Sequence, residues 1–277
     1  MPRIFYLLEK ECLEYPVVIR LPFFLLILGL LILSYFIFVL GDSANISFEI
    51  HSQGIAMPTQ MPGFSDGVFG LISMATGVLS LLLTFLYLPK TFLKTRQEGS
   101  LMFWRSMPVS DLLDHSVKLV FALILIPLIC SLVLLSAELF LYLVSLFKSS
   151  SLLSFFGPIT LGNIFVHYFS FIEKMLWLSL ATLPMACLLL CLSQWLNAPL
   201  LVFFVTYYII QVLMNYVFNL PSIGLFVEQF SRLPLDILFS NDTLQSILEV
   251  GLLSFGIAYL FAGACLLLSL QKSKYGQ

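Results

Sequence analysis

Long runs that are almost free of charge divide this chain into segments of similar length, with shorter polar stretches between them. A helix of roughly 20 residues, rising 1.5 Å per residue, crosses about 30 Å of hydrocarbon. The longest run, 175–227, contains the polar turn "SQWLNAP" at 193–199, which predicts two helices there. The alternation typical of barrel strands is absent, so helices are expected throughout. Six spans are predicted: residues 21–41, 67–89, 119–143, 175–193, 199–219 and 250–271.

Two further segments have one apolar face but carry too many charges to span a membrane. In residues 2–16, the side chains of Ile4, Leu8, Cys12 and Tyr15 fall on one helical face, whereas the charged side chains, Glu9, Lys10, Glu11 and Glu14, lie elsewhere on the helix. This pattern predicts a short helix that lies on the membrane surface and bends into the first span at Pro16 or Pro22.

The second segment, residues 220–248, precedes the last span. Glu228, Arg232 and Asp236 recur every four residues among apolar neighbours, which predicts a helix with one polar stripe. Such a helix either dips into the outer leaflet and returns, with Pro221 and Pro234 as break points, or lies along the surface. Both readings remain open at the level of sequence.

Composition places the whole chain in a membrane. Apolar residues make up 60% and charged residues 10% of its 277 residues, whereas a soluble domain carries about 25% charged residues. The mean hydropathy is +1.03. The net charge of −2 and the absence of a basic domain argue against nucleic acid as a partner. The chain is therefore expected to be an all-α integral membrane protein with one transmembrane domain over residues 1–277.

The distribution of Lys and Arg predicts the orientation. Ten of the 13 fall in the two termini and the connection 90–118, and three fall on the other side. Because positive residues concentrate in short cytoplasmic loops, both termini and residues 90–118 are expected in the cytoplasm.

Residues that could support chemistry are few. No G-x-x-x-x-G-K-[ST] motif is present, and Cys187 and Cys191 share a helical face without a His or carboxylate in the same span. We therefore predict no catalytic residue, metal site or cofactor site in the chain. The charged residue deepest in a span is Glu138, placed near the outer interface, which disfavours a transporter driven by a proton or sodium gradient.

The connection between the second and third spans contains residue types that are common at docking interfaces, and we call it the docking loop. Aromatic and Arg side chains are what interface hot spots prefer, Gly permits a sharp change of direction and Pro interrupts a helix. The alternative is a solvated connector whose aromatic residues rest at the lipid headgroups. The candidate docking residues are Arg96, Glu98, Gly99, Phe103, Trp104, Arg105 and Pro108.

The order of a surface helix, two spans, the stretch "EGSLMFWRSMPVS" with Lys118 beyond it, and four more spans resembles the type-2 ABC exporter permease family. The layout agrees over the whole chain, but the residues agree only over 96–118. The resemblance implies that a separate ATPase subunit, which would bind ATP and Mg, binds the docking loop and is coupled to the spans through it. It also implies a dimer with a second copy or paralogue, and a bacterial inner-membrane location.

Accordingly, we expect a permease subunit of an ABC exporter that has no ATPase site of its own. The resemblance would make residues 220–248 the family's outer re-entrant helices. The connections 41–66 and 148–174 are longer than a minimal permease needs, and no role is assigned to them. Two alternatives remain: a membrane scaffold or assembly factor that works without ATP, and a secondary transporter that depends on Glu138.

Overall fold

The computed structural model describes residues 3–35, 67–97, 110–147, 160–214, 218, 221–240 and 243–275. These residues are helical apart from short turns, and no strand occurs among them. The expected all-α architecture is therefore confirmed. The helices are α1 (Arg3–Glu14), α2 (Pro16–Tyr35), α3 (Gly67–Gln97), α5 (Asp111–Val120), the π-helical turn η2 (Phe121–Leu125), α6 (Ile126–Phe147), α8 (Leu161–Trp195), α9 (Pro199–Val212), α10 (Pro221–Phe239), α11 (Thr243–Val250) and α12 (Leu252–Tyr275).

Five helical segments are long and apolar enough to cross a membrane, which supports a multi-pass membrane protein. They are Pro16–Tyr35, Phe69–Lys94, Asp111–Leu146, Leu161–Trp195 and Leu253–Ser273. The predicted span 199–219 corresponds to α9, an apolar helix of 14 residues that reaches only about 21 Å. The predicted span 175–193 forms the later part of α8, because this helix begins already at Leu161.

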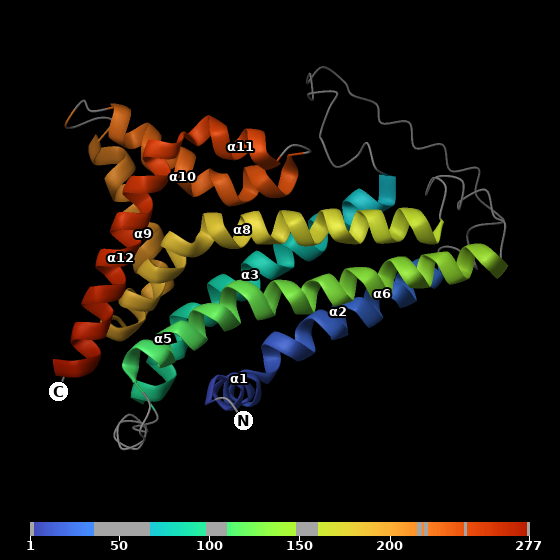
Figure 1. The fold of residues 1–277 in the computed structure, drawn as a ribbon, viewed down its shortest axis with the longest axis horizontal. Helices are drawn as coiled ribbons and strands as arrows, with labels where there is room; N and C mark the ends of the chain where they lie inside the picture. The colour runs from blue at the N-terminus through green and yellow to red at the C-terminus, as the bar shows by residue number, and fades with distance from the viewer. Residues whose placement is uncertain are drawn as a thin grey trace.

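The helices form a fan (Figure 1). α2, α3, α6 and α8 run side by side, α9 and α12 flank them, and α10 and α11 lie next to each other alongside α8. Both termini lie at one end of the bundle, together with the end of α3 and the start of α5. We call this the terminal end of the bundle and the other the opposite end. The prediction that the termini share a side with the ends of the 90–118 connection agrees with this arrangement.

Local sequence explains where several helices begin and end. Tyr15 separates α1 from α2, and Pro16 occupies the first position of α2, where a missing N–H costs nothing. Of the two predicted bend sites, Pro16 is therefore the break, and Pro22 lies inside α2. Pro199 likewise opens α9, which confirms the predicted turn at 193–199. Pro234 lies inside α10, so its prediction as a break point is wrong.

The π-helical turn η2 interrupts the long helix that runs from Asp111 to Phe147. Pro127 has no N–H with which to bond the carbonyl of Leu123 four residues earlier, and its ring crowds that carbonyl. The chain widens here, and the N–H of Ile126 bonds the carbonyl of Phe121. The hydroxyl of Ser179 on α8 shares its hydrogen between the Leu123 carbonyl at 2.5 Å and the Met175 carbonyl of its own helix at 2.8 Å. The hydroxyl of Thr84 on α3 donates to the Ala122 carbonyl at 3.0 Å. Side chains of two neighbouring helices thus stabilise the turn.

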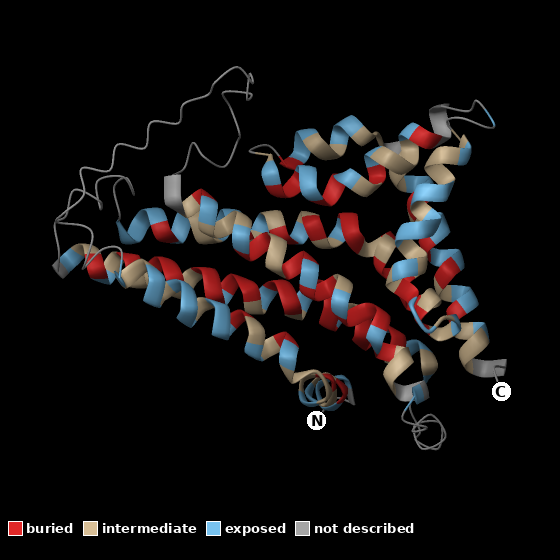
Figure 2. Ribbon diagram, turned by 180° about the vertical axis from the view of Figure 1, so that it is seen from behind, coloured by how far each residue is buried: buried red, intermediate tan, exposed pale blue. Residues whose placement is uncertain are grey.

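Burial is concentrated on α3, α6 and α8 (Figure 2). Half of the apolar window of α8 is buried, compared with 11% of that of α2. One core cluster, around Tyr87, Phe121 and Leu190, lies toward the terminal end. A second, around Phe171, Leu233 and Ile237, joins α3, α6 and α8 to α10. α2 and α12 therefore present most of their apolar surface outward, as helices in contact with lipid would.

Candidate functional site at the terminal end

The predicted docking loop is bounded by elements that the structure describes. Arg96 lies in the last turn of α3, and α5 begins at Asp111. The stretch from Glu98 to Pro108 lies outside the described residues, so the contacts of Glu98, Gly99, Phe103, Trp104, Arg105 and Pro108 stay predictions. The structure does describe the site formed where the two ends of this loop join α3 and α5.

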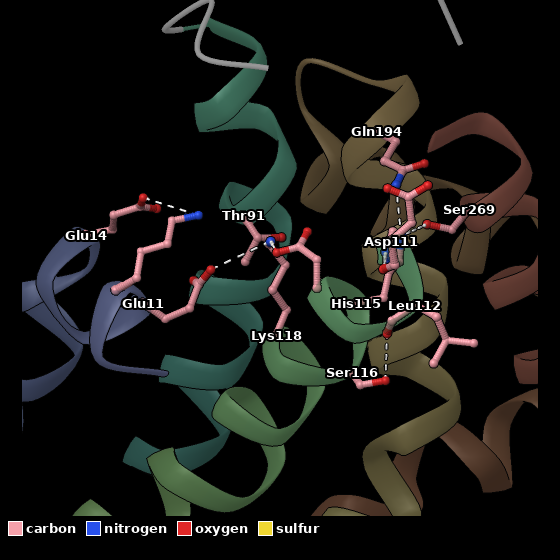
Figure 3. Close-up of polar contacts among 12 residues, drawn as sticks. Glu11, Glu14, Thr91, Asp111, Leu112, His115, Ser116, Lys118, Gln194 and Ser269 are labelled. Atoms are coloured by element: carbon pink, nitrogen blue, oxygen red, sulfur yellow. Dashed lines mark hydrogen bonds and ion pairs between the residues drawn. The ribbon is translucent and has the colours of Figure 1, made fainter. Parts of the chain in front are cut away.

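Lys118 on α5 is the centre of this site (Figure 3). Its Nζ lies 2.5 Å from Oδ1 of Asp114 one turn earlier and 3.6 Å from Oε1 of Glu11 on α1. The other carboxylate oxygen of Glu11 accepts a hydrogen bond of 2.7 Å from the hydroxyl of Tyr87 on α3. Lys118 also lies over the ring of Phe92, 4.7 Å from its centroid. We call Glu11, Tyr87, Asp114 and Lys118 the Lys118 cluster.

Two charges of the Lys118 cluster, those of Lys118 and Glu11, are buried, which makes their pairing obligatory, whereas Asp114 is partly exposed. The side chains of Lys118 and Glu11 are only 3% and 2% exposed. A buried charge without a partner is strongly unfavourable, whereas here each oxygen of Glu11 has its own partner. The cluster therefore holds α1, α3 and α5 in one arrangement beside the docking loop. Lys94 adds a further connection, because its ammonium group donates to the Glu14 carbonyl at 3.0 Å.

His115 joins α5 to two other helices. Its Nδ1 lies 2.8 Å from the carbonyl oxygen of Asp111, which can only accept, so this nitrogen donates. Its Nε2 lies 2.8 Å from the hydroxyl of Ser269 on α12 and 3.1 Å from the amide nitrogen of Gln194 on α8. Both of these groups can donate, so a neutral ring protonated at Nδ1 satisfies all three contacts. The ring of Phe92 packs against His115 with its centroid 4.7 Å away.

These contacts also correct the expected orientation of α1. The predicted apolar face was expected to lie on the membrane surface, but its members Leu8, Cys12 and Tyr15 pack against the helical core. Ile4 is exposed, and Leu7 and Glu11 are buried. The sequence analysis placed Glu11 on the polar face, since an isolated amphipathic helix would expose it.

The second predicted site, on α10, is described in full. The expected helix is confirmed, and Nη2 of Arg232 lies 2.8 Å from Oε1 of Glu228 at the surface of the protein. Partial burial raises the pKa of Asp236, as does the nearby charge of Glu249, while Arg232 acts in the opposite direction. Figure 1 shows α10 and α11 side by side, next to α8 and away from the terminal end. α10 is further tied to α9 by the hydrogen bond of 2.9 Å between the hydroxyls of Ser231 and Tyr207.

No known protein family, curated protein or solved structure matched this chain in the comparisons. Among the described residues, no group of three or more His, Cys, Asp or Glu is arranged to hold a metal ion.

Proposed function

We propose that this chain is the membrane-spanning permease subunit of an ABC exporter. A separate ATPase subunit would hydrolyse ATP and bind Mg, and the loop from Arg96 to Pro108 would dock onto it. Two permeases, identical or paralogous, would form the exporter in the inner membrane, with both termini in the cytoplasm. In this function the chain binds its ATPase and transmits movement, and it has no catalytic residue of its own.

The observation that carries this proposal is the Lys118 cluster. The docking loop leaves α3 and enters α5, and both helices are joined to α1 through Glu11, Tyr87 and Lys118. A force applied to the loop therefore acts on three helices together. The η2 turn follows directly after α5 and is a natural place for the long helix to bend, since π-helical turns often mark functional sites.

Removal of an aromatic anchor tests the docking role. Phe103→Ala or Trp104→Ala should detach the ATPase, because truncating a buried aromatic side chain costs about 3–5 kcal/mol. Arg105→Ala should have a weaker effect, because an exposed charge pair contributes about 0–1 kcal/mol. Phe169→Ala is the matched control, since this exposed aromatic lies on α8 far along the sequence from the loop. The measurement is co-purification of the ATPase and its stimulated hydrolysis.

The outcomes separate the candidate functions. If both aromatic variants bind and stimulate the ATPase like the wild type, the docking proposal is wrong. If the loop captures a soluble partner that is not an ATPase, the scaffold function applies instead. A labelling experiment tests the orientation: a single Cys at position 100 should resist an impermeant reagent added from outside, and one at position 240 should react.

A secondary transporter is a second candidate because of one observation. Glu138 is fully buried and paired with His167. Buried carboxylates among spans often belong to ion pathways. Transport that persists without ATP, collapses with the proton gradient and is lost in Glu138→Gln would favour this candidate over the exporter.

A further inference from the structure

Glu138 and His167 form a polar pair between α6 and α8. Nδ1 of His167 lies 2.5 Å from Oε1 of Glu138. The side chain of Glu138 is 0% exposed, and that of His167 is 22% exposed. The second carboxylate oxygen, Oε2, is buried and has no hydrogen-bond partner among the described residues. A ring contact with Phe69 of α3, 5.8 Å between centroids, covers another side of the imidazole.

The surrounding helices provide little charge for this pair. α2 has no charged residue after Arg20, and α3 has none before Lys90. Lys174 of α8 donates to the Ser240 carbonyl beyond the end of α10, and Arg232 is paired with Glu228. The group in contact with Glu138 that can carry a positive charge is the imidazole of His167. The titratable and charged groups on the elements packed around α6 and α8 toward this end are Tyr35, Tyr142, Tyr168, Glu173, Lys174, Tyr207, Tyr208, Glu228, Arg232, Asp236, Glu249 and Tyr259.

The burial of Oε2 limits which charge states the pair can adopt. An ionised Glu138 beside a neutral His167 would leave one negative charge in the interior, with half of the carboxylate unpartnered, which is strongly unfavourable. One added proton removes this charge. If the proton resides on the ring, an imidazolium N–H donates to the carboxylate. If it resides on the carboxyl group, the O–H donates to Nδ1, and the unpartnered oxygen is a neutral carbonyl.

We propose that Glu138 and His167 together form a binding site for a single proton between α6 and α8, so that the pair carries no net charge at neutral pH. The proton comes from the medium and returns to it without any other chemical change. The partly exposed edge of the imidazole is the route by which the proton reaches Glu138. Occupancy of this site keeps α6 and α8 joined at this level, and loss of the proton would place an unbalanced charge between them.

Solid-state NMR of the full chain in lipid nanodiscs tests the proposal without reference to transport or ATP. The protein is labelled with ¹⁵N in the His rings and with ¹³C in the Glu carboxyl groups. A dipolar contact between a ring nitrogen and a carboxyl carbon identifies the pair in the wild-type protein, so no variant is needed for assignment. The ¹³C shift reports whether Glu138 is ionised, and the ¹⁵N shifts report whether His167 is imidazole or imidazolium.

At neutral pH we expect one of two results, an imidazolium with an ionised carboxyl group or a neutral imidazole with a protonated one. Either result gives a neutral pair and supports the proposal. An ionised Glu138 beside a neutral imidazole, or protonation of both groups, would overturn it. Glu138→Gln should abolish the dipolar contact. Glu173→Gln, which removes an exposed carboxyl group on α8, should leave the signals of the pair unchanged.

Discussion

Within the described part of the chain, two acidic side chains are buried, Glu11 and Glu138, and they have different surroundings. Both oxygens of Glu11 have partners, Lys118 and Tyr87, contributed by two other helices. Glu138 has one partner, His167, and its second oxygen has none. A fully partnered charge is costly to disturb and suits a permanent structural contact. A partly partnered carboxylate is less well stabilised as an anion, which suits a pair that holds a proton.

This difference fits the positions of the two groups. The Lys118 cluster lies beside the predicted docking loop, where rigidity lets movement pass from a partner to the helices. The Glu138–His167 pair lies beyond the η2 turn, between two helices that continue to the opposite end. We expect the Lys118 cluster to be a structural contact and the Glu138–His167 pair not to be one.

The largest expected effect comes from breaking the Lys118 cluster. Lys118→Met keeps the length of the side chain but leaves Glu11 buried without its cation, which should cost about 3–5 kcal/mol in the free energy of unfolding. Arg232→Met is the control, because its pair with Glu228 is exposed and should contribute less than about 1 kcal/mol. Denaturation in mixed micelles measures both.

A double variant separates loss of charge balance from loss of packing. Glu11→Met combined with Lys118→Met removes both buried charges and should recover a large part of the stability lost in Lys118→Met. If Lys118→Met is tolerated as well as Arg232→Met, the cluster is not a structural contact and the comparison with Glu138 fails.

The η2 turn, which separates the two regions, should show an intermediate effect. Ser179→Ala removes the donor to the Leu123 carbonyl, whose usual partner is absent because of Pro127. An unsatisfied buried carbonyl costs about 1–3 kcal/mol. Ser116→Ala is the control, because its exposed hydroxyl donates to a carbonyl in its own helix and should matter little. Equal stability of the two variants would show that the turn does not need the hydroxyl of α8.

A smaller effect is expected at Glu138, the second of the two buried acidic side chains. Glu138→Gln removes a buried charge whose second oxygen is unpartnered, while the amide still reaches His167. The change in the free energy of unfolding should therefore stay within about 1 kcal/mol, the net value of one ordinary hydrogen bond. A loss as large as that of Lys118→Met would mean that Glu138 and His167 also form a permanent structural contact.

The sequence predicted the parts of this fold that depend on local patterns. The apolar runs located the long helices, and Pro16 and Pro199 marked two of their starts, because a proline without an N–H fits the first turn of a helix. The helix before the last span was likewise predicted from its polar stripe. In contrast, the early start of α8 at Leu161 was missed, because residues 161–174 are less apolar than a span requires.

The contacts of the candidate site could not be predicted in the same way. Glu11 and Tyr87 are 76 residues apart, and His115 and Ser269 are 154 residues apart, so their meeting depends on how whole helices pack. Helical periodicity reports which face of a helix is apolar, but it does not reveal that a charge on the other face has a buried partner. Glu11 was assigned to the wrong face for this reason.

The smallest expected effect concerns Cys12, the neighbour of Glu11 on α1. Burial raises the pKa of this thiol, and the negative charges of Glu11 and Glu9 raise it further. Because the thiolate is the reactive form, Cys12 should react with a maleimide more slowly than a free thiol at neutral pH, and the rate should keep rising as the pH increases. The measurement uses a chain in which the other four Cys are replaced by Ala.

Glu9→Gln sharpens this last test because Glu9 is exposed and is not part of the Lys118 cluster. Removal of its charge should lower the pKa of Cys12 slightly and accelerate the reaction by less than about fivefold, since an exposed charge contributes about 0–1 kcal/mol. Glu11→Gln should accelerate it more, because Glu11 contributes more to the raised pKa and its loss also loosens α1. Equal rates in the two variants would indicate that Lys118 cancels the effect of the Glu11 charge on the Cys12 thiol. They would also indicate that α1 stays in place without its buried charge.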